Sequence, residues 1–480
     1  MMIVQKDKVI GKEMPIGELP EGWESTSLKT LATLRKGKKP NRLDTDAWLG
    51  AIPYIDIEAF ERGNIRRYAD PESSALVDEG DIIVVWDGAR CGHVGKAPKT
   101  GALGSTLGVI QPILAHPDYI LHFLRSSYDI INTNPRGIGI PHVEPGLFWN
   151  LKVPLAPFPE QKRIMAKVED LLAKVKATKE RLAKVQAILK RFRQAVLAAA
   201  CSGRLTADWR EKNQTEDVPE GSELPPGWHW MPIKELLPPG GIFDGPFGSN
   251  LKTADYTDYG VRVVRLENVG YLQFFHQKET HISQEKYEIL AKHTVGAGDI
   301  IFASFIAEEV RACVLPKLKT RAIAKADCFC LRPRQEVINS HYLAFQLVNR
   351  ESYERLSESI HGATRPRINT TQLRNLEIRI CPLAEQQEII HRVEALFKLA
   401  DSNEKRVAAA SIRAEKLPQA ILAKAFRGEL VPTEAELAHR EGRSYESASE
   451  LLARIKADRE FRGASKTSLR SPKKNINPWG

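Results

Sequence analysis

Hydrophobic positions follow two different periods along this 480-residue chain. Within residues 158–205 and again within 382–430, apolar side chains alternate steps of three and four, the seven-residue pattern of long packed helices. The first series is Val168, Leu171, Val175, Thr178, Leu182, Val185, Leu189, Phe192 and Val196, and the second is Val393, Leu396, Ala400, Asn403, Val407, Ala410, Ala414, Leu417 and Ile421. We expect two long spacer helices that pair with each other. Two separate amphipathic helices, each packed on its own domain, are the alternative.

Residues near the ends of the predicted helices are typical of helix termini, but one proline inside the second helix is not typical of a helix interior. Pro159 and Glu160 suit a first helical turn, and Gly203 suits a C-terminal cap. The second series is rich in alanine, so that helix can approach its partner closely. Pro418 lies inside the second series and is expected to kink or break the helix near Leu417.

Shorter apolar runs separated by turn residues fill the segments before each long helix. They predict strands at residues 52–57, 81–86, 261–266 and 300–305, and helices at 117–128 and 340–358. Residues 19–157 and 224–381 therefore read as two compact domains of mixed α/β (α+β) class. Residues 1–18 are expected to form a flexible tail, 206–223 a polar linker, and 431–480 a C-terminal helix at about 445–461 followed by a basic tail.

The framework around these two domains is duplicated, as expected for an internal pseudo-two-fold repeat. Gly137, Pro141, Asn150, Glu160, Gln161, Val168, Gln194 and Gly203 recur as Gly362, Pro366, Asn375, Glu385, Gln386, Val393, Gln419 and Gly428. Every pair differs by 225, for example 362 − 137. Leu-Pro-Glu-Gly-Trp at residues 19–23 recurs as Leu-Pro-Pro-Gly-Trp at 224–228, and Gly-Asp-Ile-Ile recurs at Gly80 and Gly298 with other offsets. A duplicated scaffold with two different inserts suggests one molecule that recognises two different things in a fixed geometry.

Composition narrows the class of partner and the compartment. With 70 Lys and Arg against 60 Asp and Glu, the formal charge of +10 suits a polyanion, although many proteins are mildly basic. The six cysteines form no Cys-x-x-Cys pair, which predicts a reduced cytoplasm and no zinc site. The first residues are too charged for a signal peptide, and the apolar runs are too short to span a membrane.

A catalytic constellation is not evident. The segment at residues 88–97 resembles a phosphate loop, but Arg90 stands where glycine is needed and Ala97 where serine or threonine is needed. Neither His-Glu-x-x-His nor Gly-x-Ser-x-Gly occurs. We therefore expect no enzyme activity, no cofactor and no metal in this chain.

Basic and amide side chains gather instead on turns and strand ends of both inserts. The candidate contacts to double-stranded DNA are Arg35, Lys36, Lys38, Lys39, Arg42, Arg90, His93, Lys96, Asn250, Lys252, Arg265, Asn268, Arg311, Lys319, Arg321, Arg365 and Arg367. Arginine can fork onto guanine and asparagine onto adenine, whereas lysine mostly neutralises phosphate. For any single one of them, solvated surface charge is the favoured interpretation, whereas their concentration on loops of both inserts favours DNA contact by the group.

The paired Leu-Pro-x-Gly-Trp openings, the Pro-x-x-Glu-Gln blocks at residues 157–161 and 382–386, and the helix ends Gln-Ala-Val-Leu and Gln-Ala-Ile-Leu carry a family resemblance. In their order and spacing, the chain resembles a specificity subunit of a type I restriction-modification system. The resemblance implies two target-recognition domains separated by a long antiparallel two-helix coiled coil.

The resemblance also implies function and partners. Each domain would read one half of a bipartite asymmetric DNA site, and the helices would set the gap between the halves. Two methylation subunits would dock on the helical spacer and two restriction subunits would join them. S-adenosylmethionine, ATP and magnesium are then expected in those partners. A coiled-coil adaptor with two protein-binding domains is the alternative, and salt-dependent binding to random duplex DNA would separate the two.

Overall fold

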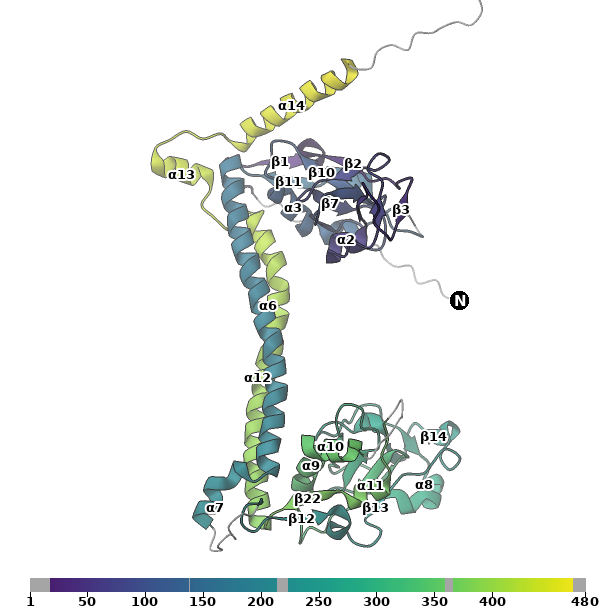
Figure 1. Ribbon diagram of the computed structural model, residues 1–480. Coiled ribbons are helices and arrows are strands. Elements are labelled where there is room, and N and C mark those ends of the chain that lie inside the picture. Colours follow the sequence, from purple (N-terminus) through teal and green to yellow (C-terminus); the bar gives the residue numbers. More distant parts are fainter. Residues whose placement is uncertain (1–17, 138, 214–222, 359–365, 469–480) are drawn as a thin grey trace, which may run out of the picture. The chain divides into compact units, whose positions relative to one another are not determined.

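The computed structural model describes residues 18–137, 139–213, 223–358 and 366–468 (Figure 1). The chain divides into two compact units. The terminal unit comprises Met1–Arg181 and Ser411–Gly480, and the central unit comprises Leu182–Ala410. Each unit holds one sheet-rich domain and a part of both long helices. The predicted mixed α/β fold class is thus confirmed.

Three sheets build the first domain, in the terminal unit. A two-stranded antiparallel sheet joins β1 (Glu24–Ser27) to β11 (Lys152–Leu155). The four-stranded sheet has the order β2 (Ala32–Lys36), β10 (Leu107–Pro112), β7 (Ile82–Val85), β8 (Val94–Lys96). The five-stranded sheet has the order β3 (Leu43–Asp44), β5 (Tyr68–Ala69), β4 (Ile52–Ile55), β9 (Gly101–Leu103), β6 (Leu76–Val77). Around them lie α1 (Leu28–Leu31), α2 (Ile57–Arg62), α3 (Pro117–Ser126), α4 (Tyr128–Thr133) and α5 (Pro145–Asn150).

The second domain, in the central unit, repeats this topology sheet for sheet. Its two-stranded sheet joins β12 (His229–Pro232) to β22 (Glu377–Ile380). The four-stranded order is β13 (Ile242–Phe243), β21 (Cys328–Leu331), β18 (Ile300–Ala303), β19 (Ala312–Val314). The five-stranded order is β14 (Tyr256–Thr257), β16 (His281–Ile282), β15 (Val261–Val264), β20 (Ala322–Ala324), β17 (Thr294–Val295). Even the parallel pair matches, β4 with β9 and β15 with β20. Inserts that differ in sequence thus share one fold.

The strands predicted from apolar runs are confirmed as β4, β7, β15 and β18, and the first predicted helix as α3. The helix predicted at 340–358 is two helices, α9 (Ser340–Val348) and α10 (Arg350–Glu358), and α8 (Gln284–Leu290) and α11 (Thr370–Asn375) complete the domain. Asn349 separates α9 from α10 with extended backbone, and its side-chain oxygen accepts a hydrogen bond from the backbone N–H of Ser352 at 3.0 Å. The prediction of one continuous helix is therefore wrong, because Asn349 ends α9 and caps the start of α10.

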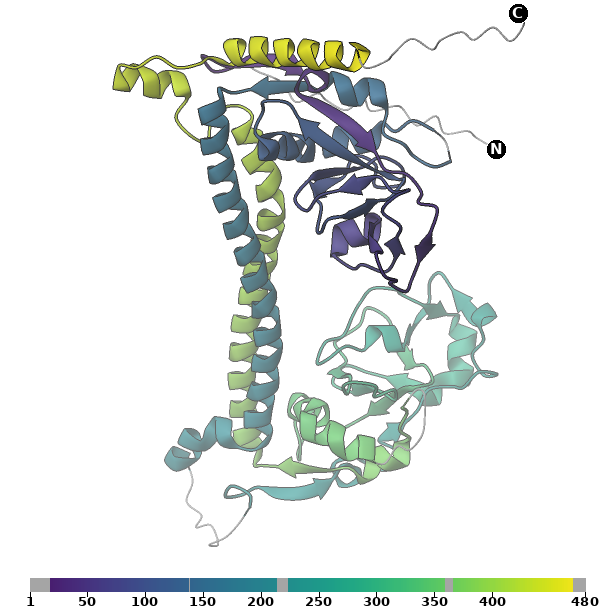
Figure 2. The ribbon, with the colours of Figure 1, turned by 45° about the horizontal axis from the view of Figure 1, so that its top comes forward.

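Two long helices run through both units: α6 (Phe158–Cys201) has 44 residues and α12 (Leu383–Ala425) has 43. Figures 1 and 2 show them side by side, with the start of α6 beside the end of α12 in the terminal unit. The predicted antiparallel pair is thus confirmed. In the central unit, Arg193 of α6 bonds Asp401 at 2.5 Å and Glu404 at 2.8 Å on α12. The predicted apolar series lies buried or half-buried except at Thr178 and Leu417, which are exposed.

Of the kink or break predicted at Pro418, the break is wrong, because α12 continues through this residue. Proline removes one helical hydrogen bond and crowds the carbonyl four residues earlier, at Ala414. Apolar burial on both sides holds the helix together there: Ala414 and Ile421 are both buried, and Ile421 belongs to the core of the terminal unit. Packing thus outweighs the local cost.

The duplicated framework makes the same hydrogen bonds in both units. Trp23 Nε1 donates to Glu160 Oε1 at 2.9 Å, and Trp228 Nε1 donates to Glu385 Oε2 at 2.9 Å. Both carboxylates are fully buried, so each tryptophan joins the start of its domain to the start of the long helix that follows it. The tryptophans of the two Leu-Pro-x-Gly-Trp motifs therefore serve the fold, since each one binds a buried carboxylate.

Each opening also packs against the glycine that follows a long helix. Gly203, with φ +76°, leaves room for Pro225 and Trp228, while Gly428, with φ +74°, leaves room for Pro20. A Cβ at position 428 would come within 2.4 Å of Pro20. The start of the first domain, at Pro20, thus meets the end of α12, and the start of the second domain, at Pro225, meets the end of α6.

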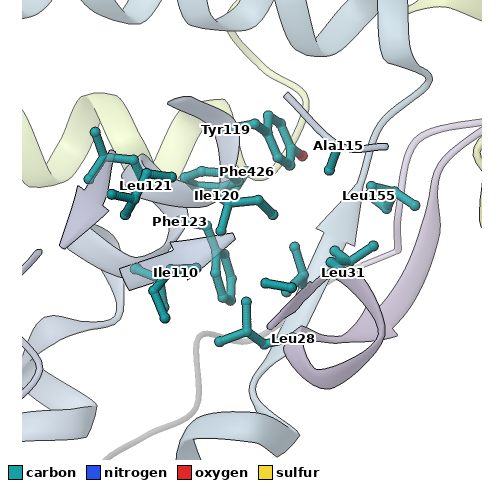
Figure 3. Packing of buried hydrophobic residues seen from close by; sticks show 14 of the residues in the cluster. Leu28, Leu31, Ile110, Ala115, Tyr119, Ile120, Leu121, Phe123, Leu155 and Phe426 are labelled. Atoms are coloured by element: carbon teal, nitrogen blue, oxygen red, sulfur yellow. The ribbon is translucent and has the colours of Figure 1, made fainter. Parts of the chain in front are cut away.

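The C-terminal residues complete the first domain. Phe426 inserts its ring between Tyr119 and Phe123 of α3, with ring centroids at 5.1 and 5.6 Å (Figure 3). After it come α13 (Glu434–Glu441) and α14 (Ala448–Ser468), whose Leu451 and Ile455 join the same core. Sequence reasoning expected α14 to be shorter and left α13 out, although the capping box of Thr433 and Glu436 signals its start. Likewise, the predicted linker begins with η1 (Arg204–Thr206) and α7 (Ala207–Asn213).

Candidate nucleic-acid interface

The shared topology makes positions in the two domains directly comparable. The two isoleucines of each Gly-Asp-Ile-Ile motif begin β7 and β18, so Ile83 and Ile301 are equivalent. Cross-strand registers carry the equivalence from these two residues to Val109 and Cys330 and then to Arg35 and Phe243. The next residues along β2 and after β13 are Lys36 and Asp244, so these two charged side chains occupy equivalent positions.

The ends of β7 and β18 give three further equivalences. Asp87 forms a β-bridge with His142, and Phe305 forms one with Arg367. Asp87 and Phe305 differ by 218 (305 − 87), the offset of the Gly-Asp-Ile-Ile motif. His142 and Arg367 differ by 225 (367 − 142), the offset of the framework. The carbonyls of Thr106 and Asp327 accept from the backbone N–H groups just before Asp87 and Phe305.

We call these two sets the junction clusters, since each lies where the framework meets an insert. The first junction cluster is Lys36, Asp87, Thr106 and His142, and the second is Asp244, Phe305, Asp327 and Arg367. The same backbone arrangement thus carries different side chains in the two domains.

In the first junction cluster, Asp87 holds two cationic or titratable partners. Its Oδ2 lies 3.1 Å from Lys36 Nζ, and its Oδ1 lies 2.6 Å from His142 Nδ1. Lys36 also lies 5.8 Å from the ring centroid of Trp86. The side chains of Lys36 and His142 are each 44% exposed, so both can still meet a ligand.

In the second junction cluster, an arginine is held between carboxylates and rings. Arg367 Nη2 pairs with Asp327 and lies 3.9 Å from Asp244 Oδ2. Its guanidinium lies 5.8 Å from the ring centroids of both Phe247 and Phe305. Burial raises the pKa of Asp244, while hydrogen bonds from the N–H groups of Gly245 and Asp327 oppose this rise. Phe247 is 53% exposed, which leaves an apolar ring on the surface beside the arginine.

A basic loop extends from the first junction cluster. Arg35, Lys38 and Lys39 are exposed, and neither lysine forms an ion pair within the described residues. Arg42 follows with its guanidinium 3.9 Å from the ring centroid of Trp48. Asp70 fixes the loop by accepting from the Arg42 backbone N–H at 2.8 Å. Hydrogen bonds from the Ser73 side chain and from Arg42 lower the pKa of Asp70 to about 2.

Three other predicted residues of the first domain lie near a cavity of about 500 Å³ lined by Phe60, Glu61, His93, Val94, Gly95, Lys96, Arg125 and Tyr128. Arg90 pairs with Glu61, and Lys96 Nζ lies 2.7 Å from Asp118 Oδ1. Burial lowers the pKa of His93, whose ring lies edge-on to Phe60. These cations are therefore partly neutralised by carboxylates of their own domain.

The second domain carries a group of cations around Tyr256. Arg265 and Lys325 lie 5.7 and 5.3 Å from its ring centroid, and Lys325 Nζ donates to its hydroxyl at 2.7 Å. The remaining predicted residues Asn250, Lys252, Lys319 and Arg321 are exposed on loops. These positions suit contact with a polyanion.

Two predicted contacts lie in structural roles instead. Asn268 is fully buried, and its amide donates to the carbonyls of Phe275 at 2.9 Å and Gln277 at 3.0 Å. Arg311 Nη1 donates to the carbonyls of Leu266 at 3.3 Å and Val269 at 3.1 Å. We leave both out of the proposed interface because their hydrogen-bonding groups serve the fold. Arg365 lies outside the described residues.

Sequence reasoning missed His142, Asp87, Asp244 and Phe247. A signal for the first was present, since His142 and Arg367 are separated by the framework offset and each follows a repeated proline. Among the residues that the structure describes, no three His, Cys, Asp or Glu side chains gather as a metal site. Nor does any helix in the described ranges have the length and apolar content that crossing a bilayer requires.

Comparisons with known proteins agree with this architecture. The family model described as type I restriction modification DNA specificity domain matches residues 20–187 and 247–410. The type I restriction enzyme StySPI specificity subunit of Salmonella potsdam is 31% identical, with 94% of this chain and 98% of that protein covered. The EcoDI specificity subunit of Escherichia coli is 30% identical, with 95% and 99% covered.

Two solved structures share the fold. A chain from a structure concerned with complex assembly and conformational transition of the type I R-M system has a TM-score of 0.64 and 21% identity, covering 86% of this chain and 100% of that one. The HsdS subunit from Thermoanaerobacter tengcongensis has a TM-score of 0.54 and 21% identity, covering 87% and 100%.

Proposed function

The chain belongs to the family of type I restriction-modification DNA specificity subunits, and from this premise we propose that each of its two sheet domains reads one half of a bipartite asymmetric DNA site. The observation that carries the proposal is the equivalence of the two domains. Their sheets share one strand order, whereas the side chains at equivalent junction positions differ in charge and shape. Such a pair of domains can present two different surfaces from one scaffold.

Exposed cations supply the sequence-independent part of binding. Arg35, Lys38 and Lys39 in the first domain and Lys319 and Arg321 in the second lie on accessible loops or strand ends. Cations that neutralise phosphates release counterions and give affinity that falls steeply with salt. The junction clusters supply side chains for base contacts, and the first of them adjoins the loop of Lys38 and Lys39.

Chemistry belongs to partner subunits in this proposal. The chain acts as a non-catalytic recognition subunit, and methylation subunits that bind S-adenosylmethionine dock on the pair α6 and α12. Restriction subunits that use ATP and magnesium join the same complex. The chain then directs adenine methylation or cleavage to the sites that its two domains select.

A domain exchange tests the division of labour. We replace residues 19–157 with the equivalent segment of a related subunit, reconstitute the complex and map methylated adenines. One half of the recognised site should change while the other half and the gap persist. A folded chimera in which both halves change would show that the domains do not read independently. If binding to random duplex DNA shows no salt dependence, the protein-binding adaptor becomes the better description.

A further inference from the structure

We propose that His142 and Arg367 are equivalent base-reading residues, one for each half of the DNA site, and that carboxylates of their own domains orient them. The inference rests on the proposed function and names the side chains that carry it. Both residues belong to the duplicated framework by their offset, and both form a β-bridge to the residue that lies two positions after a central strand, β7 or β18. The framework thus fixes the backbone at this position while the side chain differs between the domains.

Charge around the second junction cluster favours a base edge over a phosphate. Arg367 lies between Asp327 and Asp244, so two carboxylates accompany one guanidinium. An anionic phosphate placed there would be repelled by both carboxylates, whereas the neutral edge of a base would not. By contrast, Lys38 and Lys39 have no ion pair within the described residues and suit phosphate contact.

The arginine is also held in one orientation before DNA arrives. Asp327 engages Nη2, and the rings of Phe247 and Phe305 each lie 5.8 Å from the guanidinium. Within the described residues Nη1 and Nε have no partner, and Nη2 carries a second hydrogen beside the one that meets Asp327, so Nη2 and one neighbouring nitrogen can still act as a two-donor fork. A fixed fork matches the O6 and N7 acceptors of guanine in the major groove. The exposed ring of Phe247 can pack on the neighbouring base.

His142 occupies the position in the first domain that is equivalent to Arg367, but its side chain offers a different hydrogen-bonding group. Its Nδ1 lies 2.6 Å from Asp87 Oδ1, and because a carboxylate only accepts, Nδ1 carries the proton. In the neutral ring Nε2 is then an acceptor, and the side chain is 44% exposed. An acceptor pairs with the exocyclic amino group of adenine or cytosine rather than with the acceptor edge of guanine. The two domains therefore read different base classes at equivalent positions.

Selection from a randomised duplex library tests this assignment, with the full chain assembled with its methylation subunits. Arg367→Lys keeps the charge that a phosphate contact needs and removes the fork. We expect preference at one base pair of one half-site to fall by roughly 5- to 150-fold, with the other half-site and the salt slope unchanged. Asp327→Asn should weaken preference at the same base pair. Arg350→Lys is the matched control, since Arg350 pairs with Glu354 and lies 4.8 Å from the ring of Tyr353 on α10.

The first domain provides an independent arm. His142→Gln should alter preference at one base pair of the other half-site only. Circular dichroism shows whether each variant folds, and His142→Gln still tests the proposal if Arg367→Lys does not fold. The inference is overturned if folded variants at both positions select the wild-type site, or if each changes affinity equally for all sequences. A wild-type complex that enriches no bipartite site would instead refute the proposed function itself.

Discussion

Substituting Phe426 by alanine should destabilise the terminal unit selectively. The ring is 3% exposed and lies edge-on to both Tyr119 and Phe123, with centroid distances of 5.1 and 5.6 Å. Removing a buried phenylalanine ring costs about 3–5 kcal/mol. Since both neighbouring rings are anchored in the same core by α3, the cavity can collapse only partly, which favours the upper half of this range.

Hydrogen exchange measured by mass spectrometry resolves the two units. Opening of the terminal unit, reported by peptides from α3 (Pro117–Ser126), should increase by roughly 700- to 4,000-fold. Peptides from α9 (Ser340–Val348) in the central unit should keep their protection. Phe461→Ala is the control, because that ring on α14 is 75% exposed and its loss should cost less than about 0.5 kcal/mol. Equal loss of protection in α3 and α9, or none in α3, would refute the reasoning.

Three further outcomes follow from the structure. Burial lowers the pKa of His122 to about 4, below the unfolded value near 6.5, so stability is complete above pH 6.5 and is lost as pH falls toward 4. His122→Leu should remove up to about 3 kcal/mol of that pH dependence, measured by urea unfolding; an unchanged pH profile would contradict this. Neutralising Lys38 or Lys39 to glutamine should weaken binding to all duplexes and reduce the salt slope by about one per phosphate contact, and an unchanged slope would return them to plain surface charge. Inserting seven residues after Lys176 and seven near Glu415 lengthens both helices by roughly 10 Å, so the gap between half-sites should grow by about three base pairs; a folded double insertion that selects the original gap would exclude the helices as its determinant.

Sequence alone predicts the long helices and the duplicated framework well, because both depend on local or ungapped patterns. The seven-residue series needs only side-chain spacing, and Glu160 and Glu385 stand out by their constant offset. The shared topology of the inserts could not be predicted in this way. Its strands have two to six residues each, and sequences as different as Leu-Gly-Val-Ile-Gln-Pro in β10 and Cys-Phe-Cys-Leu in β21 fill equivalent places. Burial and register, which depend on distant contacts, decide such strands.

The candidate site shows the same limit. Exposed cations such as Lys38 could be predicted from turn residues, but Asn268 and Arg311 look equally suitable in sequence. Their side chains instead bond backbone carbonyls that only the folded chain brings near. His142 follows the repeated Pro141, but only the matching β-bridges of His142 and Arg367 place both residues at equivalent positions of the two domains.

The insertion of Phe426 into the first domain also bears on synthesis of the chain. The central unit is one continuous stretch, Leu182–Ala410, whereas the terminal unit joins a segment made before that stretch to a segment made after it. At roughly 5–20 residues per second, a ribosome needs about 10–50 s to pass from residue 181 to residue 426. During that time the surfaces of Tyr119 and Phe123 that receive Phe426 stay uncovered. The domain translated first is therefore completed last, and the nascent chain carries an unfinished apolar core while its second domain folds.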